Sequence, residues 1–337
     1  MKKIVSILLT AVLLASAALL TGCGDSKAIL ESSKEDKTVI GSVAGFDVPL
    51  EIYRYVALNY RRDYENGDGG VWIGDGSDEL YEKLEKAVDD TVVGMYTTLA
   101  MAKDYGIDPD DSYFVDTTDT KMTEIYKSYG SYRTYADAIA EYNMNDAVYR
   151  FIVRDELLAE EILVKMIENG EIERYSDSFR EIAESDTFVR IKQILISSTN
   201  GKSDEENLSK IKEVRAKLDK GEDFDSLVGE YNEDIYMFGN SDGYYISRGS
   251  FYPEFEDAAF SLSVDETSDI IKTDAGYCIL MRCEKEDAFI EKNLTDMYVT
   301  YRDGLYNLAL EAKKATLSVE WNEKAEKYTI FNLDTKK

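Results

Sequence analysis

The chain of 337 residues contains no histidine and only three cysteines. Because imidazole is the side chain that normally titrates near neutral pH, histidine-based proton transfer is excluded throughout the chain. Cys278 and Cys283 lie in one predicted strand, 276–284, where their odd spacing puts them on opposite faces. At about 3.3 Å per residue they are roughly 16 Å apart, too far for a disulfide. The fold must therefore depend on its core.

Basic residues are scarce relative to acidic ones. Lys and Arg total 39 against 67 Asp and Glu, which gives a formal net charge of −28. Such a surface repels phosphate backbones and anionic headgroups, so neither nucleic acid nor electrostatic docking on lipid is expected. The charge itself is typical of a well-solvated surface.

The N-terminus has the pattern of an export signal. Lys2 and Lys3 precede an apolar run, Ile4–Leu20, that is shorter than the roughly 20 residues of a spanning helix. The run ends in Leu-Thr-Gly-Cys at 20–23, which resembles the lipobox of bacterial lipoproteins. The alternatives to a lipoprotein signal are a transmembrane anchor and a plain secretory signal. The resemblance implies that residues 1–22 are removed and that acylated Cys23 anchors an extracytoplasmic protein to the cell membrane. Two acyl chains, at about 0.8 kcal/mol per buried methylene, make a durable anchor.

The segment after the signal predicts a helical domain. Residues 23–37 are polar and are expected to form a tether, and 38–186 begin with a short β-prone stretch at 38–50. Apolar residues then recur at intervals of three and four, which predicts amphipathic helices over 80–102, 117–128, 132–142 and 146–169. Asn145 is suited to cap the last of these helices.

Residues 187–286 predict a different architecture. Apolar and polar residues alternate as in strands at 189–196, 268–272 and 276–284. Three helices are expected between the first two strands, one opened by a Ser203–Glu206 capping box and the last by Pro253. This segment is therefore predicted to be a small antiparallel sheet covered by helices, which makes the chain α+β.

The C-terminal segment, 287–337, is predicted to contain another amphipathic helix and a strand at 316–321. This helix has no obvious partner within 189–284. We therefore expect the segment to pack on 38–186, so that one helical domain is made from both ends of the chain.

Three motifs in the middle of the chain resemble the parvulin-type peptidyl-prolyl cis-trans isomerases: 189–196, 245–260 and 273–280. Nearly the whole mature chain, with Val-Ala-Gly at 43–45 and Ala-Lys-Asp-Tyr-Gly-Ile at 102–107, resembles PrsA-like extracytoplasmic foldase lipoproteins and SurA-type chaperones. The resemblance implies a helical chaperone domain with an inserted parvulin domain. It also implies a foldase that isomerises prolyl bonds in unfolded or partly folded exported proteins.

The parvulin resemblance implies a site for the proline ring. Phe251 and Phe255 match the bulky apolar positions of the family pocket. The family pattern Gly-Gly-Asp-Leu-Gly is replaced by Asn-Ser-Asp-Gly-Tyr at 240–244, so that a pocket leucine is missing. Either Tyr244 or Tyr245 is expected to take its place.

The same resemblance implies four catalytic positions. Asp234 matches an acidic or cysteine side chain beside the amide, and Thr273 matches a common hydroxyl. The two family histidines are replaced by Gln193 and Cys278. Glutamine keeps a neutral donor and acceptor, whereas cysteine is a weak hydrogen-bonding group that is often simply buried.

Rotation about a prolyl amide bond requires neither a nucleophile nor a metal. The barrier is about 18–20 kcal/mol, and it falls when an apolar socket binds the twisted amide better than the planar one. Neither a cofactor nor a metal is expected; Asp68 and Asp75, in a glycine-rich loop, do not have calcium-loop spacing.

Three functional hypotheses remain. The first is an active isomerase. The second is a chaperone or holdase whose parvulin domain binds extended chains without efficient catalysis, which the loss of both histidines favours. The third is a lipoprotein solute receptor, which only the lipobox supports.

Eight tyrosines of the helical segment are either a client-binding cradle or helix-surface packing: Tyr53, Tyr55, Tyr60, Tyr64, Tyr126, Tyr129, Tyr132 and Tyr135.

Overall fold

The computed structural model describes residues 32–65, 67–74, 76–237 and 243–333, which form two compact units. The inserted unit consists of Ile167–Ala309, and the helical unit combines the chain before Ile167 with the stretch from Leu310. No helix among the described residues is both long and apolar enough to cross a bilayer. Cys23 and the predicted signal lie outside the described residues.

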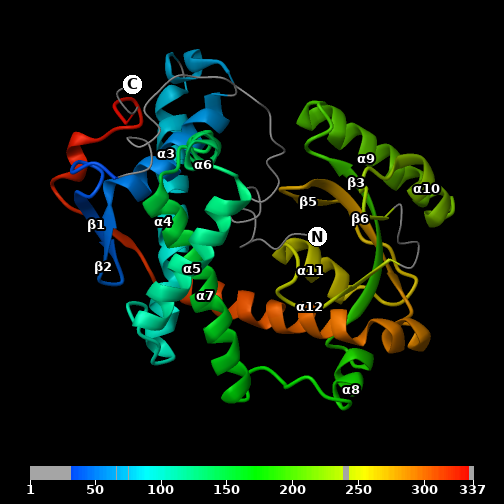
Figure 1. The fold of residues 1–337 in the computed structure, drawn as a ribbon. Helices are drawn as coiled ribbons and strands as arrows, with labels where there is room; N and C mark the ends of the chain where they lie inside the picture. The colour runs from blue at the N-terminus through cyan, green and yellow to red at the C-terminus, as the bar shows by residue number, and fades with distance from the viewer. Residues whose placement is uncertain (1–31, 66, 75, 238–242, 334–337) are drawn as a thin grey trace. The chain divides into compact units, whose positions relative to one another are not determined.

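Five α-helices precede residue 170 in the described chain (Figure 1): α3 (Leu50–Glu65), α4 (Ser77–Asp104), α5 (Ser112–Ser128), α6 (Tyr132–Ala140) and α7 (Asp146–Glu168). Each predicted helix is present. The buried positions of α4 include Leu84, Val88 and Val92, which follow the predicted intervals. Asn145 caps α7 by accepting the N–H of Val148 at 3.0 Å.

Two local features of this unit were not predicted. Helix α3 lacks a clear signal in its sequence, yet Leu50 and Ile52 at its start are buried. Helix α5 begins at Ser112 rather than 117, because the Asp111 carboxylate accepts the N–H of Tyr113 at 2.8 Å and caps the helix there.

A small sheet joins the two ends of the helical unit. Strands β1 (Val39–Val43) and β2 (Phe46–Pro49) form an antiparallel hairpin within the β-prone stretch predicted at 38–50. Strand β7 (Val319–Trp321) pairs antiparallel with β1, so that the sheet order is β2-β1-β7. Pairing between the first and last described strands makes one unit from two segments that are distant in sequence. Single turns η2 (Gly69–Trp72) and η4 (Ala325–Lys327) complete the unit.

The inserted unit contains a four-stranded antiparallel sheet in the order β4-β3-β6-β5. Its strands are β3 (Val189–Ser197), β4 (Tyr244–Ile246), β5 (Ile271–Thr273) and β6 (Gly276–Cys283). The small antiparallel sheet predicted for the middle of the chain is confirmed. The strand predicted at 268–272 is shorter and later than expected, and Thr267 makes only an isolated bridge to Met281.

Helices cover both faces of this sheet (Figure 1): α9 (Asp204–Leu218) and α10 (Phe224–Tyr231) lie on one face, and α11 (Pro253–Ser261) lies on the other. Strand β3 alternates between the two. Ile194 and Ile196 pack with α9 and α10, whereas Val189 and Ile191 share a cluster with Phe255 of α11. This alternation decides which side chains can meet at a site on the α11 face.

Two further helices belong to the inserted unit: α8 (Phe179–Glu184) and the larger part of α12 (Asp287–Lys314), which continues into the helical unit. They form a cluster with Phe179, Phe188 and Ile290 at its centre. The inserted unit thus extends beyond 187–286 at both ends. Helix α12 has partners among residues 189–284 that its amphipathic pattern did not reveal, such as Tyr245.

Candidate functional site

A buried carboxylate lies at the centre of the candidate site. Oδ2 of Asp234 accepts hydrogen bonds from Nε2 of Gln193 at 2.6 Å and from Oη of Tyr244 at 2.5 Å. Its other oxygen, Oδ1, accepts the backbone N–H of Tyr236 at 3.0 Å. Asp234, Gln193 and Tyr244 are each less than 9% exposed. We call these three residues the Asp234 network.

The segment before Asp234 is anchored along β3. The side-chain oxygen of Asn232 accepts the N–H of Leu195 at 2.8 Å, and the N–H of Glu233 donates to the Leu195 carbonyl at 2.8 Å. Glu233 also accepts an N–H from Ser197 and pairs with Lys210, and the hydrogen bond from Lys210 helps to hold its pKa below the usual value against the opposing effect of burial. These contacts place Asp234 beside Gln193.

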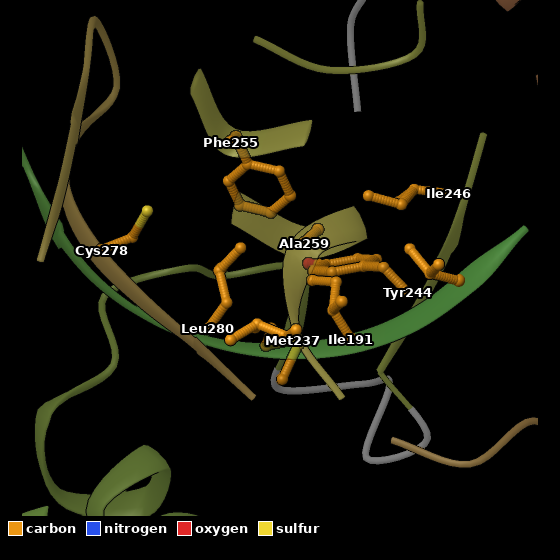
Figure 2. Close-up of a cluster of buried hydrophobic side chains, with 10 residues drawn as sticks. Ile191, Met237, Tyr244, Ile246, Phe255, Ala259, Cys278 and Leu280 are labelled. Atoms are coloured by element: carbon orange, nitrogen blue, oxygen red, sulfur yellow. The ribbon is translucent and has the colours of Figure 1, made fainter. Parts of the chain in front are cut away.

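Tyr244 connects the network to two stacked phenylalanines, Phe251 and Phe255, which we call the aromatic set. Its ring centroid lies 6.2 Å from that of Phe251, which stacks on Phe255 at 4.9 Å with an interplanar angle of 12°. Figure 2 shows the side chains of Tyr244 and Phe255 directed into the same cluster above the sheet. Phe255 is buried, whereas Phe251 is half-buried and is the more accessible of the two phenylalanines. Burial first, and then the hydrogen bond to Asp234, raises the pKa of Tyr244 well above its ordinary value.

Two of the four predicted catalytic residues lie outside this network. Cys278 is 1% exposed within the apolar cluster, where burial raises the pKa of its thiol to about 12. It is opposite Leu195 in the sheet, and Gln193 is opposite Leu280, so the two histidine-replacing residues are diagonal neighbours on one face. Thr273 uses its hydroxyl in the β5–β6 turn, where it accepts the N–H of Ala275 at 3.2 Å.

Tyr245 is not brought together with the other predicted substrate-binding residues. Its ring stacks on Phe289 of α12 at 4.2 Å and 4°, and its hydroxyl accepts the N–H of Glu286 at 2.9 Å. Because adjacent strand residues point to opposite faces, only one of the two tyrosines can reach Asp234. The structure gives that position to Tyr244.

One residue that supports the site was not predicted from the sequence. Glu256 in the first turn of α11 is 4% exposed, and its carboxylate accepts the N–H groups of Gly249 and Phe251 at 2.9 and 2.7 Å. Burial raises its pKa. The available signal was an acidic residue in the first turn of a helix, which is too common to indicate this role.

Among the described residues there is no group of three or more cysteine or acidic side chains arranged to hold a metal. What the site offers is an apolar aromatic surface, Phe251 with Phe255, next to a desolvated network of neutral donors around one carboxylate. An aromatic surface of this kind suits a proline ring, and fixed dipoles in a water-poor site can favour one state of an amide over another.

The antiparallel sheet, its covering helices and this site define a parvulin-type domain. In agreement, residues 192–284 match the Rotamase family, described as the PPIC-type PPIASE domain. The matched range begins within β3 and ends just after β6, so it contains every residue of the Asp234 network and the aromatic set.

Curated relatives extend the match beyond this domain. The chain is 31% identical over 213 residues to foldase protein PrsA of Geobacillus kaustophilus, covering 62% of this chain and 67% of the relative. It is 28% identical over 231 residues to foldase protein PrsA of Geobacillus sp. WCH70, covering 66% and 75%. The chain therefore belongs to the PrsA family of foldases, parvulin-type isomerases that assist protein folding.

Two solved structures are similar to the chain at low overall similarity. The crystal structure of the peptidylprolyl isomerase PrsA from Bacillus anthracis has 18% sequence identity and a TM-score of 0.34, covering 66% of this chain and 95% of that one. The foldase PrsA structure from Streptococcus pneumoniae has 19% identity and a TM-score of 0.34, covering 75% and 90%. The family assignment rests on the sequence matches.

Proposed function

We propose that this foldase catalyses prolyl cis-trans isomerisation in exported proteins through the Asp234 network and the aromatic set. The observation that carries the proposal is the connection of the two through Tyr244, which donates to Asp234 and lies beside Phe251. The proline ring would contact Phe251 and Phe255, and rotation about its imide bond would occur next to Gln193 and Asp234.

In this proposal, catalysis comes from desolvation and preferential binding of the twisted amide. Rotation removes the resonance of the imide, so the twisted form carries less charge separation than the planar form and is favoured by an apolar surface. Gln193 donates one N–H to Asp234, and a glutamine amide also has a second N–H and a carbonyl that can hydrogen-bond to the imide. No proton needs to be transferred.

A proline-limited peptide assay tests this function. The wild-type chain should accelerate isomerisation, and Phe251→Ala should raise KM about tenfold, because a buried aromatic contact contributes on the order of 1 to 2 kcal/mol. Phe331→Ala, a 51% exposed phenylalanine in the helical unit, is the matched control and should behave like wild type. Absence of acceleration by the wild-type chain at high concentration would exclude the catalytic proposal.

A holdase with a weak parvulin domain is the second candidate. Two observations favour it. Cys278 is a buried thiol that takes no part in the Asp234 network. Oδ2 of Asp234 already accepts hydrogen bonds from two side chains of the protein itself. This candidate predicts that the chain suppresses aggregation of an unfolded client while prolyl isomerisation proceeds at the uncatalysed rate.

The proposed clients are unfolded or partly folded exported proteins, and the proposed location is the outer face of the cell membrane, reached through lipidated Cys23. Family membership and the lipobox pattern at 20–23 support this placement.

A further inference from the structure

The loop from Ser247 to Phe251 connects β4 to α11 and ends at the accessible phenylalanine of the aromatic set. Its position therefore decides where Phe251 stands relative to Phe255. Two elements hold this loop, one on each side.

On the α11 side, Glu256 fixes the end of the loop. Its two carboxylate oxygens accept separate backbone N–H groups, those of Gly249 and Phe251, at 2.9 and 2.7 Å. The loop cannot move relative to α11 without breaking charge-assisted hydrogen bonds in a buried setting, which are stronger than neutral ones.

On the α12 side, two glycines allow the loop backbone to touch the helix backbone. A Cβ on Gly304 would clash with the carbonyl oxygen of Arg248, and a Cβ on Gly249 would clash with the carbonyl oxygen of Gly304. Gly249 also has a φ of 81°, which disfavours any other residue. Neither clash involves a flexible side chain that could turn away.

A side chain of α12 then fixes the register of this contact. Nδ2 of Asn307, one turn after Gly304, donates to the carbonyl of Gly249 at 2.9 Å. Both α12 residues lie outside 192–284, the range matched to the isomerase domain. The contact and the site all lie within the inserted unit.

We propose that Gly304 and Asn307 are positioning residues for proline binding: they hold the loop that carries Phe251 against Phe255. This inference rests on the proposed function, because it assigns α12 a part in the same proline site. It means that the domain matched at 192–284 is completed by a helix from the C-terminal segment.

The test compares KM and kcat for a proline peptide in the full chain. Gly304→Ala must displace the loop, so KM should rise about tenfold while kcat stays within about twofold, because the Asp234 network is untouched. Asn307→Ala removes one hydrogen bond without a clash and should raise KM by about threefold. Gly229→Ala is the matched control, since Gly229 lies in α10 and a Cβ there meets nothing within 4 Å.

The split between the two constants separates positioning from a loss of folded protein, which would lower kcat and leave KM unchanged. Wild-type KM in both Gly304→Ala and Asn307→Ala would overturn the inference while leaving the proposed function intact. If the wild-type chain shows no turnover, the dissociation constant of the peptide, measured by NMR shifts of Phe251, replaces KM. A wild-type chain that neither turns over nor binds the peptide overturns both proposals.

Discussion

At the scale of single residues, the site places the neutral donors Gln193 and Tyr244 around a carboxylate and contains no imidazole. A buried carboxylate is costly unless its oxygens are hydrogen-bonded. Asp234 has three donors, from Gln193, Tyr244 and the Tyr236 backbone. Two of these donors are side chains that remain uncharged near neutral pH. Both side-chain donors therefore keep the same charge under ordinary conditions.

This arrangement predicts an isomerisation rate that is constant between about pH 6 and about pH 9. The chain has no histidine, and burial raises the pKa of Tyr244 above its ordinary value and that of Cys278 to about 12. Gln193→His adds an imidazole, which should introduce a titration near its ordinary pKa of about 6.5. Rates of both proteins across this range provide the measurement. A wild-type titration near neutral pH would show that another group controls catalysis.

The carboxylate of Asp155, in α7, predicts pH-dependent stability. Oδ2 accepts the hydroxyl of Thr98 at 3.1 Å, while Oδ1 is sealed from solvent without a partner. Burial raises the pKa of Asp155 to about 7. An aspartate in the unfolded chain loses its proton near pH 3.9. The folded protein thus binds the extra proton between these values, and stability must fall as the pH rises from about 4 to about 7.

Asp155→Asn should remove this contribution. At pH 4 the variant and wild type should be similarly stable, whereas at pH 8 the variant should be more stable by on the order of 2 to 4 kcal/mol. Urea unfolding at both pH values measures the difference. Asp116→Asn, at an exposed position of α5, is the control. An equal effect of the Asp155 substitution at both pH values would contradict the expected titration.

At the scale of elements, the site depends on strand alternation and on helix ends. Tyr244 and Tyr245 are chemically identical, but one lies beside Phe251 and the other stacks on Phe289 because they are adjacent in β4.

Helix α9 begins at a complete capping box, in which Ser203 and Glu206 each bond the other's backbone N–H. The predicted capping box is confirmed.

Loss of this cap should destabilise the inserted unit. Ser203→Ala removes the acceptor for the Glu206 N–H and should cost about 1 kcal/mol. Ser178→Ala is a matched control, because Ser178 stands at the start of α8 without a side-chain capping bond. Its effect should be no more than a few tenths of a kcal/mol. Denaturant unfolding of the two variants measures both effects; equal losses would show that the capping box contributes nothing specific.

At the scale of the whole molecule, the tyrosines of the helical unit serve largely in packing. Tyr135 is fully buried and Tyr55 nearly so, and Tyr135 contacts three other tyrosine rings. Of the eight tyrosines considered for a client-binding cradle, only Tyr132 is largely exposed. Apolar area with a polar tip suits such half-buried positions on helix surfaces.

The proposed lipid anchor at Cys23 determines where the whole chain is located. Cys23→Ser should abolish acylation and move the protein from the membrane fraction to the soluble fraction, because the two acyl chains provide the binding energy. Fractionation and labelling with a radioactive fatty acid measure this. Cys283→Ser, at a half-buried thiol, is the control and should remain in the membrane fraction. Retention of an unlabelled Cys23→Ser protein at the membrane would indicate a transmembrane anchor instead.

Much of this protein could be predicted from the sequence because the relevant signals are local. Three features depend on residues within a few positions of one another: the spacing of the buried residues in α4, the cap that Asn145 provides, and the alternation of side chains along β3. Asp234 and Gln193 were predicted as site residues, but only by resemblance, since they are 41 positions apart. Their hydrogen bond could not be deduced from spacing.

Tertiary structure alone decided the contacts that join distant segments. It selected Tyr244 over Tyr245, placed Cys278 in the core, gave Glu256 two backbone donors and brought Gly304 against the Gly249 loop. These outcomes depend on strand register and on which face of a helix is covered, and neither is encoded in a short stretch of sequence. Local patterns determine which elements form, whereas their packing determines which side chains meet.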